Sequence, residues 1–254
     1  AVRGGGGRRR RRLTRVHAAL EHVSPLPRRA HAAEYLDEPG HDPRELEASL
    51  GHVAAVNRWL GGTRAVLRHV LPRLLPDRTT CILDVGTGDG DIPRAIVRAA
   101  RRRDLAVRIV AADLHPQILE IARRKTAAYP EISVERADAL SLPYPDDAFD
   151  IALLTLTLHH FEGEDQEKAL RELARISRGV IVVNELLRSR ANYLGARLLA
   201  ATVWRRNRIT RHDGPLSVLR AFTAPELLAL SRNAGLREAR VYRHFFQRLV
   251  LVAQ

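Results

Sequence analysis

Three alternating glycines follow a buried-strand pattern in the first half of the chain. They are Gly86, Gly88 and Gly90. The apolar run before them, residues 81–85, carries one carboxylate at Asp84, and a helical pattern begins at residue 92. A strand, a tight glycine turn and a helix start, in that order, let a ligand approach bare backbone at the carboxyl end of a parallel strand. The segment therefore predicts a small-molecule site with Asp84 at its mouth.

The acids of this segment decide which ligand fits. In the dinucleotide fingerprint G-x-G-x-x-G the third glycine lets the helix pack closely on the strand, but here that position is Asp91 or Pro93, depending on the glycine counted first. A pyrophosphate would also lie among the carboxylates of Asp84, Asp89 and Asp91 with no basic residue beside it. Because like charges repel, the segment favours a cationic or zwitterionic ligand.

The run D-x-G-x-G-x-G from Asp84 to Gly90 resembles motif I of the class I S-adenosylmethionine-dependent methyltransferases. The cofactor of that family carries an ammonium group and a sulfonium, which suit an acidic turn. The resemblance implies S-adenosyl-L-methionine as the cofactor. It implies cofactor contacts from Asp84, Gly86, Thr87, Gly88 and Gly90. An ordinary glycine turn of an α/β protein is the competing interpretation.

Two further acids close the next two strand patterns. The segment 107–112 ends at Asp113, and the segment beginning at residue 132 ends at Asp138. An acid that closes the second strand of a Rossmann-like unit commonly accepts hydrogen bonds from both ribose hydroxyls. The resemblance implies that Asp138 contacts the adenine amino group. It adds Leu114, Ala139 and Leu156 to the cofactor site. Either acid alone could instead be a helix N-cap or a loop residue.

The remaining patterns complete an α/β chain. Short apolar runs at residues 151–154, 180–183 and 249–253 have the character of buried strands. Thr223 and Glu226 have the spacing of a capping box that opens a helix. The resemblance covers about residues 44–254 and implies a Rossmann-like, seven-stranded, mostly parallel sheet with helices on both faces and an antiparallel last strand.

Segments outside the sheet divide the chain further. Residues 1–42 form a basic, glycine- and arginine-rich arm that we expect to be unstructured, because such composition cannot bury a core. Residues 43–254 are the expected methyltransferase domain. Within it, residues 43–78 should form a helical cover, and residues 189–222 a helical insertion after the fifth strand that caps the acceptor pocket. Asn57, Arg58 and Trp59 in the cover could contact a ligand, or could be ordinary helix-surface residues.

Acceptor chemistry is expected in the loops after the fourth and fifth strands. His159 and His160 lie in the first loop, and an imidazole titrates close to neutral pH, so either could be a general base. A purely structural role is the alternative. We do not predict a metal site there, because adjacent side chains diverge and no partner ligand has the usual spacing.

A second catalytic cluster is predicted inside the insertion. It consists of Arg211, His212 and Asp213, which belong to a polar stretch between apolar helices, and the Arg211 guanidinium could hold an anionic oxygen. An Asp-Gly-Pro turn at residues 213–215 explains the same residues without chemistry.

Composition limits the functions that remain. The chain has 254 residues, 45% hydrophobic residues and a formal net charge of +13, of which +8 lies in residues 1–30, with nine arginines and one glutamate. One cysteine, Cys81, and the lack of a secretory pattern favour a cytoplasmic protein. No apolar run is long enough to span a membrane. The oligomeric state is not predicted.

We therefore expect methyl transfer from S-adenosyl-L-methionine to oxygen or carbon of a small, largely apolar acceptor such as a phenol, quinol or polyketide. The segment 155–158 lacks the Asn/Asp-Pro-Pro-Tyr/Phe motif of amino-group methylating relatives. A nucleic-acid partner is therefore not expected. An RNA methyltransferase that uses the basic arm, or a non-catalytic cofactor-binding protein, is the alternative.

Overall fold

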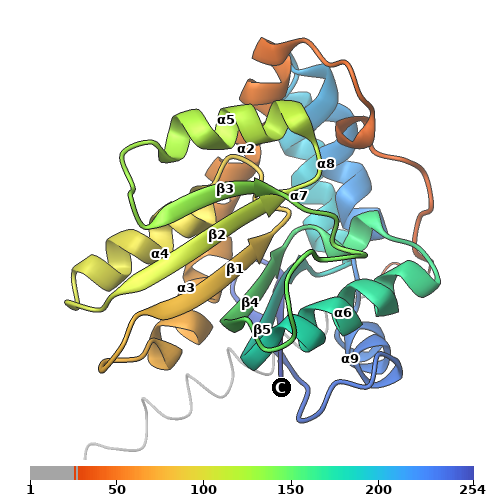
Figure 1. Cartoon of the computed structure of the whole chain (residues 1–254). Helices are drawn as coiled ribbons and strands as arrows, with labels where there is room; N and C mark the ends of the chain where they lie inside the picture. The colour runs from red at the N-terminus through yellow and green to blue at the C-terminus, as the bar shows by residue number, and fades with distance from the viewer. Residues whose placement is uncertain (1–25, 27) are drawn as a thin grey trace, which may run out of the picture.

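The computed structural model describes residue 26 and residues 28–254. Its centre is a seven-stranded sheet in the order β3-β2-β1-β4-β5-β7-β6 (Figure 1). The strands are β1 (Thr80–Val85), β2 (Val107–Asp113), β3 (Ile132–Arg136), β4 (Phe149–Thr155), β5 (Ser177–Leu186), β6 (Arg240–His244) and β7 (Arg248–Ala253). Strands β1 to β5 pair in parallel, and β7 runs antiparallel to both β5 and β6. The Rossmann-like sheet predicted from the sequence is confirmed.

Helices cover both faces of this sheet. They are α2 (Pro43–Trp59), α3 (Gly62–Val70), α4 (Asp91–Arg101), α5 (Pro116–Thr126), α6 (Glu164–Ile176), α7 (Arg190–Ala201), α8 (Arg208–Arg220) and α9 (Ala224–Asn233). Short 3-10 turns are η1 (Tyr35–Asp37), η2 (Leu71–Arg73) and η3 (Leu158–His160). Helix α9 begins with the predicted capping box, in which Thr223 and Glu226 each bond the other's backbone. None of the described helices is both long and apolar enough to cross a membrane.

Two apolar layers follow from the alternation of side chains along the strands. On one face α3 and α4 pack on strand residues such as Ile82, Ile109 and Ile151. On the other face α6 and α9 pack on Leu83 and Leu154. With both faces covered, the middle residues of the central strands are apolar, as buried parallel strands require. The polar residues of the site are thereby confined to the strand ends and the loops beyond them.

The segment before α2 (residues 28–42) and the helices α7 and α8 converge on the edge where the parallel strands end. In Figure 1 the orange N-terminal segment passes beside α7 and α8 on the side toward which the strand arrows point. Helix α8 contacts η1, α2 and η3. Helices α2 and α3 lie within residues 43–78, and α7 and α8 lie within residues 189–222. Their roles as a cover and an acceptor-side insertion stay predictions.

The sequence assignment of the arm needs correction at its end. Residues 1–25 and 27, which include the arginine run, lie outside the described residues. Residues 28–42, however, are packed on the fold: Glu34 is 2% exposed, and Ala30 donates a backbone hydrogen bond to the carbonyl of Leu219. The N-terminal segment, as we call residues 28–42, therefore belongs to the folded part of the chain.

Candidate active site

The glycine turn after β1 has the geometry that its sequence predicts. Gly86, Gly88 and Gly90 have φ angles of 66°, 58° and 76°, a region that L-residues with a side chain rarely adopt. A Cβ at Gly86 would lie 2.2 Å from Oγ1 of Thr157, and one at Gly90 would lie 2.7 Å from Cγ2 of Thr126. Glycine is therefore required both by the turn and by its close neighbours.

Asp84 is buried beneath this turn. Its Oδ2 accepts a hydrogen bond from Oγ1 of Thr87 at 2.7 Å, whereas Oδ1 has no hydrogen-bond partner within the described part of the chain. Burial raises the pKa of Asp84 to about 7, although the bond from Thr87 lowers it. A buried carboxylate with an unused oxygen fits a cationic ligand group, since a positive charge there would offset the cost of burial.

The next acids along the sheet edge also face the cavity. Asp113 accepts backbone hydrogen bonds from Gly88 and His115, each at 3.1 Å, and burial raises its pKa. Asp138 accepts one from the backbone of Leu140 at 2.9 Å. Asp113 and Asp138 line one cavity together with Leu114, Ala139 and Leu156. Their contacts with ribose and adenine stay predictions.

Leu156 closes the cofactor side of this cavity with a strained backbone. Its φ is 52°, and its N–H donates to the carbonyl of Asn184 at 2.9 Å. Strained residues of this kind are often found at functional sites. Asn57 lines the same cavity and donates to Oδ2 of Asp91 at 3.1 Å. Burial, together with the charge of Asp89, raises the pKa of Asp91 to about 6.

The cavity continues from the glycine turn to a second group of polar side chains. It has a volume of about 880 Å³. Its apolar lining includes Leu50, Val53, Leu60, Phe161, Leu198, Leu199, Trp204, Val218 and Phe246. Such a cavity can hold a nucleoside-containing cofactor and an apolar molecule side by side, because ligand pockets of about 300–1,000 Å³ bury most of a ligand's surface.

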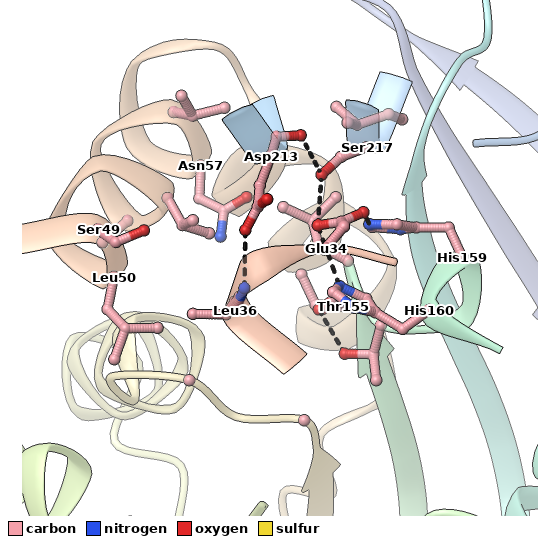
Figure 2. Close-up of a pocket in the computed structure, with 18 of the residues that line it drawn as sticks. Glu34, Leu36, Ser49, Leu50, Asn57, Thr155, His159, His160, Asp213 and Ser217 are labelled. Atoms are coloured by element: carbon pink, nitrogen blue, oxygen red, sulfur yellow. Dashed lines mark hydrogen bonds and ion pairs between the residues drawn. The ribbon is translucent and has the colours of Figure 1, made fainter. Parts of the chain in front are cut away.

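The polar group at the far end is built around the two histidines (Figure 2). Nδ1 of His159 lies 2.7 Å from Oε2 of Glu185, and Nδ1 of His160 lies 2.8 Å from Oδ1 of Asp37. The Nε2 atoms face Glu34, at 3.6 Å for His159 and 3.8 Å for His160. We call Glu34, His159 and His160 the acceptor-side cluster.

The expectation that the two adjacent side chains diverge was wrong. The ring centroids of His159 and His160 are only 4.5 Å apart, with an angle of 34° between the planes. The tight η3 turn holds both rings on one side, and a carboxylate fixes each ring from behind. The spacing of residues around the two histidines could not indicate Glu34, because Glu34 lies more than a hundred residues before them in the sequence.

The imidazoles and carboxylates around the acceptor-side cluster shift one another's pKa values. Burial alone would lower the pKa of His160, but the carboxylates of Glu34 and Asp37 raise it to about 9. Burial would raise the pKa of Glu185, but the two imidazoles lower it below its ordinary value. The group can thus keep several ionised side chains in a site where His159 and Glu34 are each 2% exposed.

Two arginines fix the backbone of the acceptor-side cluster. Arg220 donates to the carbonyls of His159 and His160 at 3.0 and 2.8 Å, and to that of Ala32. Arg29 donates to the carbonyls of His159 and Phe161 at 3.0 and 3.2 Å. These bonds join the N-terminal segment to the η3 turn and keep Glu34 opposite the histidines.

Two residues of the second predicted cluster, Arg211 and His212, do not face the cavity. Arg211 is exposed, and His212 stacks on Tyr35 with ring centroids 3.8 Å apart. The expected Asp-Gly-Pro turn is part of α8, with Pro215 inside the helix. Asp213, the third residue of the predicted cluster, does line the cavity, and it accepts hydrogen bonds from the backbone of Tyr35 and Leu36, both at 2.9 Å. The correction therefore concerns Arg211 and His212, which do not line the cavity.

Glu34 and Asp37 are the site residues that the sequence analysis did not identify. A signal was present: residues 34–42 contain four acids and no lysine or arginine, although they follow an arginine-rich stretch. Such a change in charge indicates a boundary between a solvated arm and a packed segment. Glu185 directly follows the fifth strand pattern, but nothing local relates it to His159.

Comparisons with known proteins agree with this geometry. Residues 82–179 match a family described as a methyltransferase domain. The chain is 42% identical to the demethylmenaquinone methyltransferase of Thermus thermophilus over 96 residues, which cover 37% of this chain and 41% of that protein. It is 35% identical to the malonyl-[acyl-carrier protein] O-methyltransferase of Halorhodospira halophila over 116 residues, covering 45% of this chain and 37% of that one. The matches thus span less than half the length of these curated relatives.

A solved structure extends the similarity to the whole fold. The structure of a SAM-dependent methyltransferase from Aquifex aeolicus aligns with a TM-score of 0.59 and 17% identity, covering 84% of this chain and 98% of that one. At this identity the likeness concerns the fold. The glycine turn, the acids at the strand ends, the order of the strands and the matched domain lead to one conclusion: residues 82–179 form a methyltransferase domain, and the chain has the fold of the class I S-adenosylmethionine-dependent methyltransferases.

Proposed function

We propose that this protein transfers a methyl group from S-adenosylmethionine to an oxygen or carbon atom of a small, largely apolar acceptor such as a phenol, quinol or polyketide. The observation that carries the proposal is the single cavity that joins the glycine turn to the acceptor-side cluster through apolar walls. The quinone and acyl-carrier methyltransferases among the relatives support an acceptor of this class.

The residues of the glycine turn fit the proposed cofactor. The unused oxygen of Asp84 can accept from an ammonium group, and the bare backbone of residues 86–90 leaves room for the methionine moiety. The carboxylate of Asp113 is placed at the end of β2 for ribose hydroxyls. When bound, S-adenosylmethionine supplies the methyl group, and its sulfur keeps the electron pair of the broken S–C bond.

Acceptor binding is assigned to the far end of the cavity. Its apolar walls hold the acceptor and exclude water, which fixes the attacking atom near the methyl carbon. A lone pair or carbanion of the acceptor forms the new bond, and the proton that the acceptor loses leaves through the acceptor-side cluster. Glu185 and Asp37 orient the two imidazoles so that their Nε2 atoms face the cavity.

The RNA alternative would use the arginine run, which lies outside the described residues. Glu34 and His159 are each 2% exposed, which favours an acceptor that enters the cavity whole. We also retain a cytoplasmic location as a proposal. It is supported by Cys81, a free thiol of the kind that persists in a reducing compartment.

The proposal is tested by incubating the full chain with methyl-labelled S-adenosylmethionine and a panel of phenols, quinols and polyketides, with bulk RNA as a separate substrate. We expect label in an organic-extractable product whose mass has increased by one methylene. Deletion of residues 1–25 should leave that activity unchanged. Label in RNA that disappears on this deletion would reject the small-molecule proposal, and cofactor binding without transfer to any acceptor would favour a non-catalytic protein.

A further inference from the structure

The acceptor-side cluster has the geometry of a metal site. One donor atom each from Glu34, His159 and His160 can be chosen so that all three lie within 4.8 Å of one another. Oε1 of Glu34 lies 3.6 Å from Nε2 of His159, and Oε2 lies 3.8 Å from Nε2 of His160. All three residues line the cavity, as Figure 2 shows for their side chains. Two imidazoles and one carboxylate thus converge on one point at the cavity wall.

The distances suit a small ion with modest adjustment. Two tetrahedral ligands that each lie about 2.1 Å from a zinc-sized ion are about 3.4 Å apart. The two observed histidine–carboxylate separations exceed that spacing by only a few tenths of an ångström. A small movement of the two rings toward each other would complete a three-ligand arrangement, with the remaining position open to the cavity.

Each histidine is supported from behind in the way that metal ligands are. The Nδ1 atoms of His159 and His160 contact the carboxylates of Glu185 and Asp37 at 2.7 and 2.8 Å. A carboxylate on one ring nitrogen fixes the tautomer and the ring orientation, and directs the lone pair of the other nitrogen toward the metal. Both rings of the cluster therefore present Nε2 to the cavity for the same reason.

The cluster also contains an unsatisfied acceptor. Oε1 of Glu34 is buried and has no hydrogen-bond partner among the described residues, while Oε2 accepts from Ser217 at 2.9 Å. The nearest guanidinium is that of Arg220, 3.8 Å away, but its nitrogens donate to backbone carbonyls. A buried carboxylate oxygen without a partner is costly, and a cation between it and the imidazoles would remove that cost.

We propose that Glu34, His159 and His160 bind a divalent transition-metal ion of the zinc, iron(II), cobalt, nickel or manganese group. Imidazole with carboxylate suits these ions, whereas calcium and magnesium prefer sets of oxygen ligands. The site is formed only when the N-terminal segment packs on η3, because Glu34 comes from that segment. Metal binding and the closure of the cavity by residues 28–42 are thereby coupled.

The ion would activate the acceptor for methyl transfer, a role that rests on the proposed function. Its open position faces the acceptor end of the cavity, where it can take an acceptor oxygen as a ligand. A metal ion lowers the pKa of a bound hydroxyl and stabilises the resulting anion. Phenols, enols and quinols would then react as oxyanions or as their carbon-nucleophile forms. In metal-loaded protein Nε2 of both histidines is occupied by the metal, so the acceptor's proton would leave to solvent rather than to an imidazole.

The proposal is tested with cobalt(II) as a spectroscopic probe. The full chain is freed of metal with a chelator and titrated with cobalt(II) chloride, while visible absorption and calorimetry report the site and its stoichiometry. We expect one ion per chain, visible bands of a protein-bound ion, and displacement of cobalt by zinc(II). Glu34→Gln should weaken binding at least about 30-fold while keeping the shape of the side chain, and His160→Asn should do the same.

The chain offers a matched control in another histidine pair. Nε2 of His69 lies 2.9 Å from Nε2 of His244, and neither residue lines the cavity. His244→Gln should leave cobalt binding at the cluster unchanged. Binding that survives in both Glu34→Gln and His160→Asn but is lost in His244→Gln would overturn the proposal, as would no binding above that of a buffer blank.

Methyl transfer is measured separately on chelated and metal-loaded protein. Full transfer by chelated protein that binds no cobalt rejects the metal site and leaves the proposed function intact. Cobalt binding without transfer to any acceptor supports the metal site and rejects the proposed function. Circular dichroism of each variant confirms that loss of metal does not reflect loss of fold.

Discussion

The two halves of the cavity are built in different ways. The cofactor half comes from strand ends and loops between residues 84 and 139, and its side chains follow one another along neighbouring strands. The acceptor half joins Glu34, His159, Glu185 and Asp213 from four distant segments. The glycine turn for the cofactor is specified by local backbone geometry. The side chains proposed to act on the acceptor are brought together by long-range packing. Substitutions in the cofactor half should therefore affect cofactor affinity, and substitutions in the acceptor half should affect turnover.

The largest effect is expected in the acceptor half. His159→Ala removes an imidazole that faces the cavity and leaves Glu185 buried without its partner. We expect kcat to fall by about 10²–10³-fold, the range typical for loss of a group that handles the acceptor's proton. Affinity for S-adenosylhomocysteine, measured by calorimetry, should change less than about twofold. Equal turnover in variant and wild type would remove His159 from the mechanism.

The corresponding change in the cofactor half is Asp113→Ala. Its carboxylate is placed for two ribose hydroxyls, and hydrogen bonds to a charged group contribute about 1.5–3 kcal/mol each. We expect affinity for S-adenosylhomocysteine to fall by at least about 100-fold. Asp165→Ala, an exposed acid at the start of α6, serves as control. Unchanged affinity in a folded Asp113→Ala protein would refute the ribose assignment.

The sequence predicts the cofactor half well because its signals are local. Each glycine of the turn has a positive φ, and each acid lies at or just beyond the end of the strand that positions it. The acceptor half has no such signal. His159 and His160 are recognisable as reactive residues, but the side chains that direct them lie on β5 and in the N-terminal segment. That segment is part of the arm, residues 1–42, that the sequence predicts to be unstructured.

Tertiary packing also overrode local preference in the insertion. An Asp-Gly-Pro stretch favours a turn, yet residues 213–215 continue α8. Gly214 is needed there because a Cβ would lie 2.4 Å from Cζ3 of Trp204. This glycine permits close helix packing. Residues 211 and 212, which such a turn would have aimed at the acceptor, point instead to solvent and to Tyr35.

A change of pH should affect the cofactor half selectively. Burial raises the pKa of Asp84 to about 7, so the free protein holds a proton there below that pH. An ammonium group binds the ionised form, and the proton must leave first. Lowering the pH from 7 to 5.5 should therefore weaken S-adenosylhomocysteine binding by about tenfold. Calorimetry at several pH values checks this, and Asp84→Asn should bind weakly with a flatter pH profile.

The smallest effect is expected where the N-terminal segment is attached. Asp213→Asn weakens two backbone hydrogen bonds, from Tyr35 and Leu36, which we expect to cost about 1–2 kcal/mol locally. Hydrogen exchange should become faster in residues 34–42, and turnover should drop a few-fold with unchanged cofactor affinity. Unaltered exchange in that segment would show that Asp213 does not hold it.

The division of the cavity is tested most directly by a crystal structure of the full chain with S-adenosylhomocysteine. We expect the ribose hydroxyls at Asp113, the amino group at Asp84, and the sulfur directed toward Glu34, His159 and His160. A ligand bound elsewhere, or one whose sulfur points away from these three residues, would contradict it.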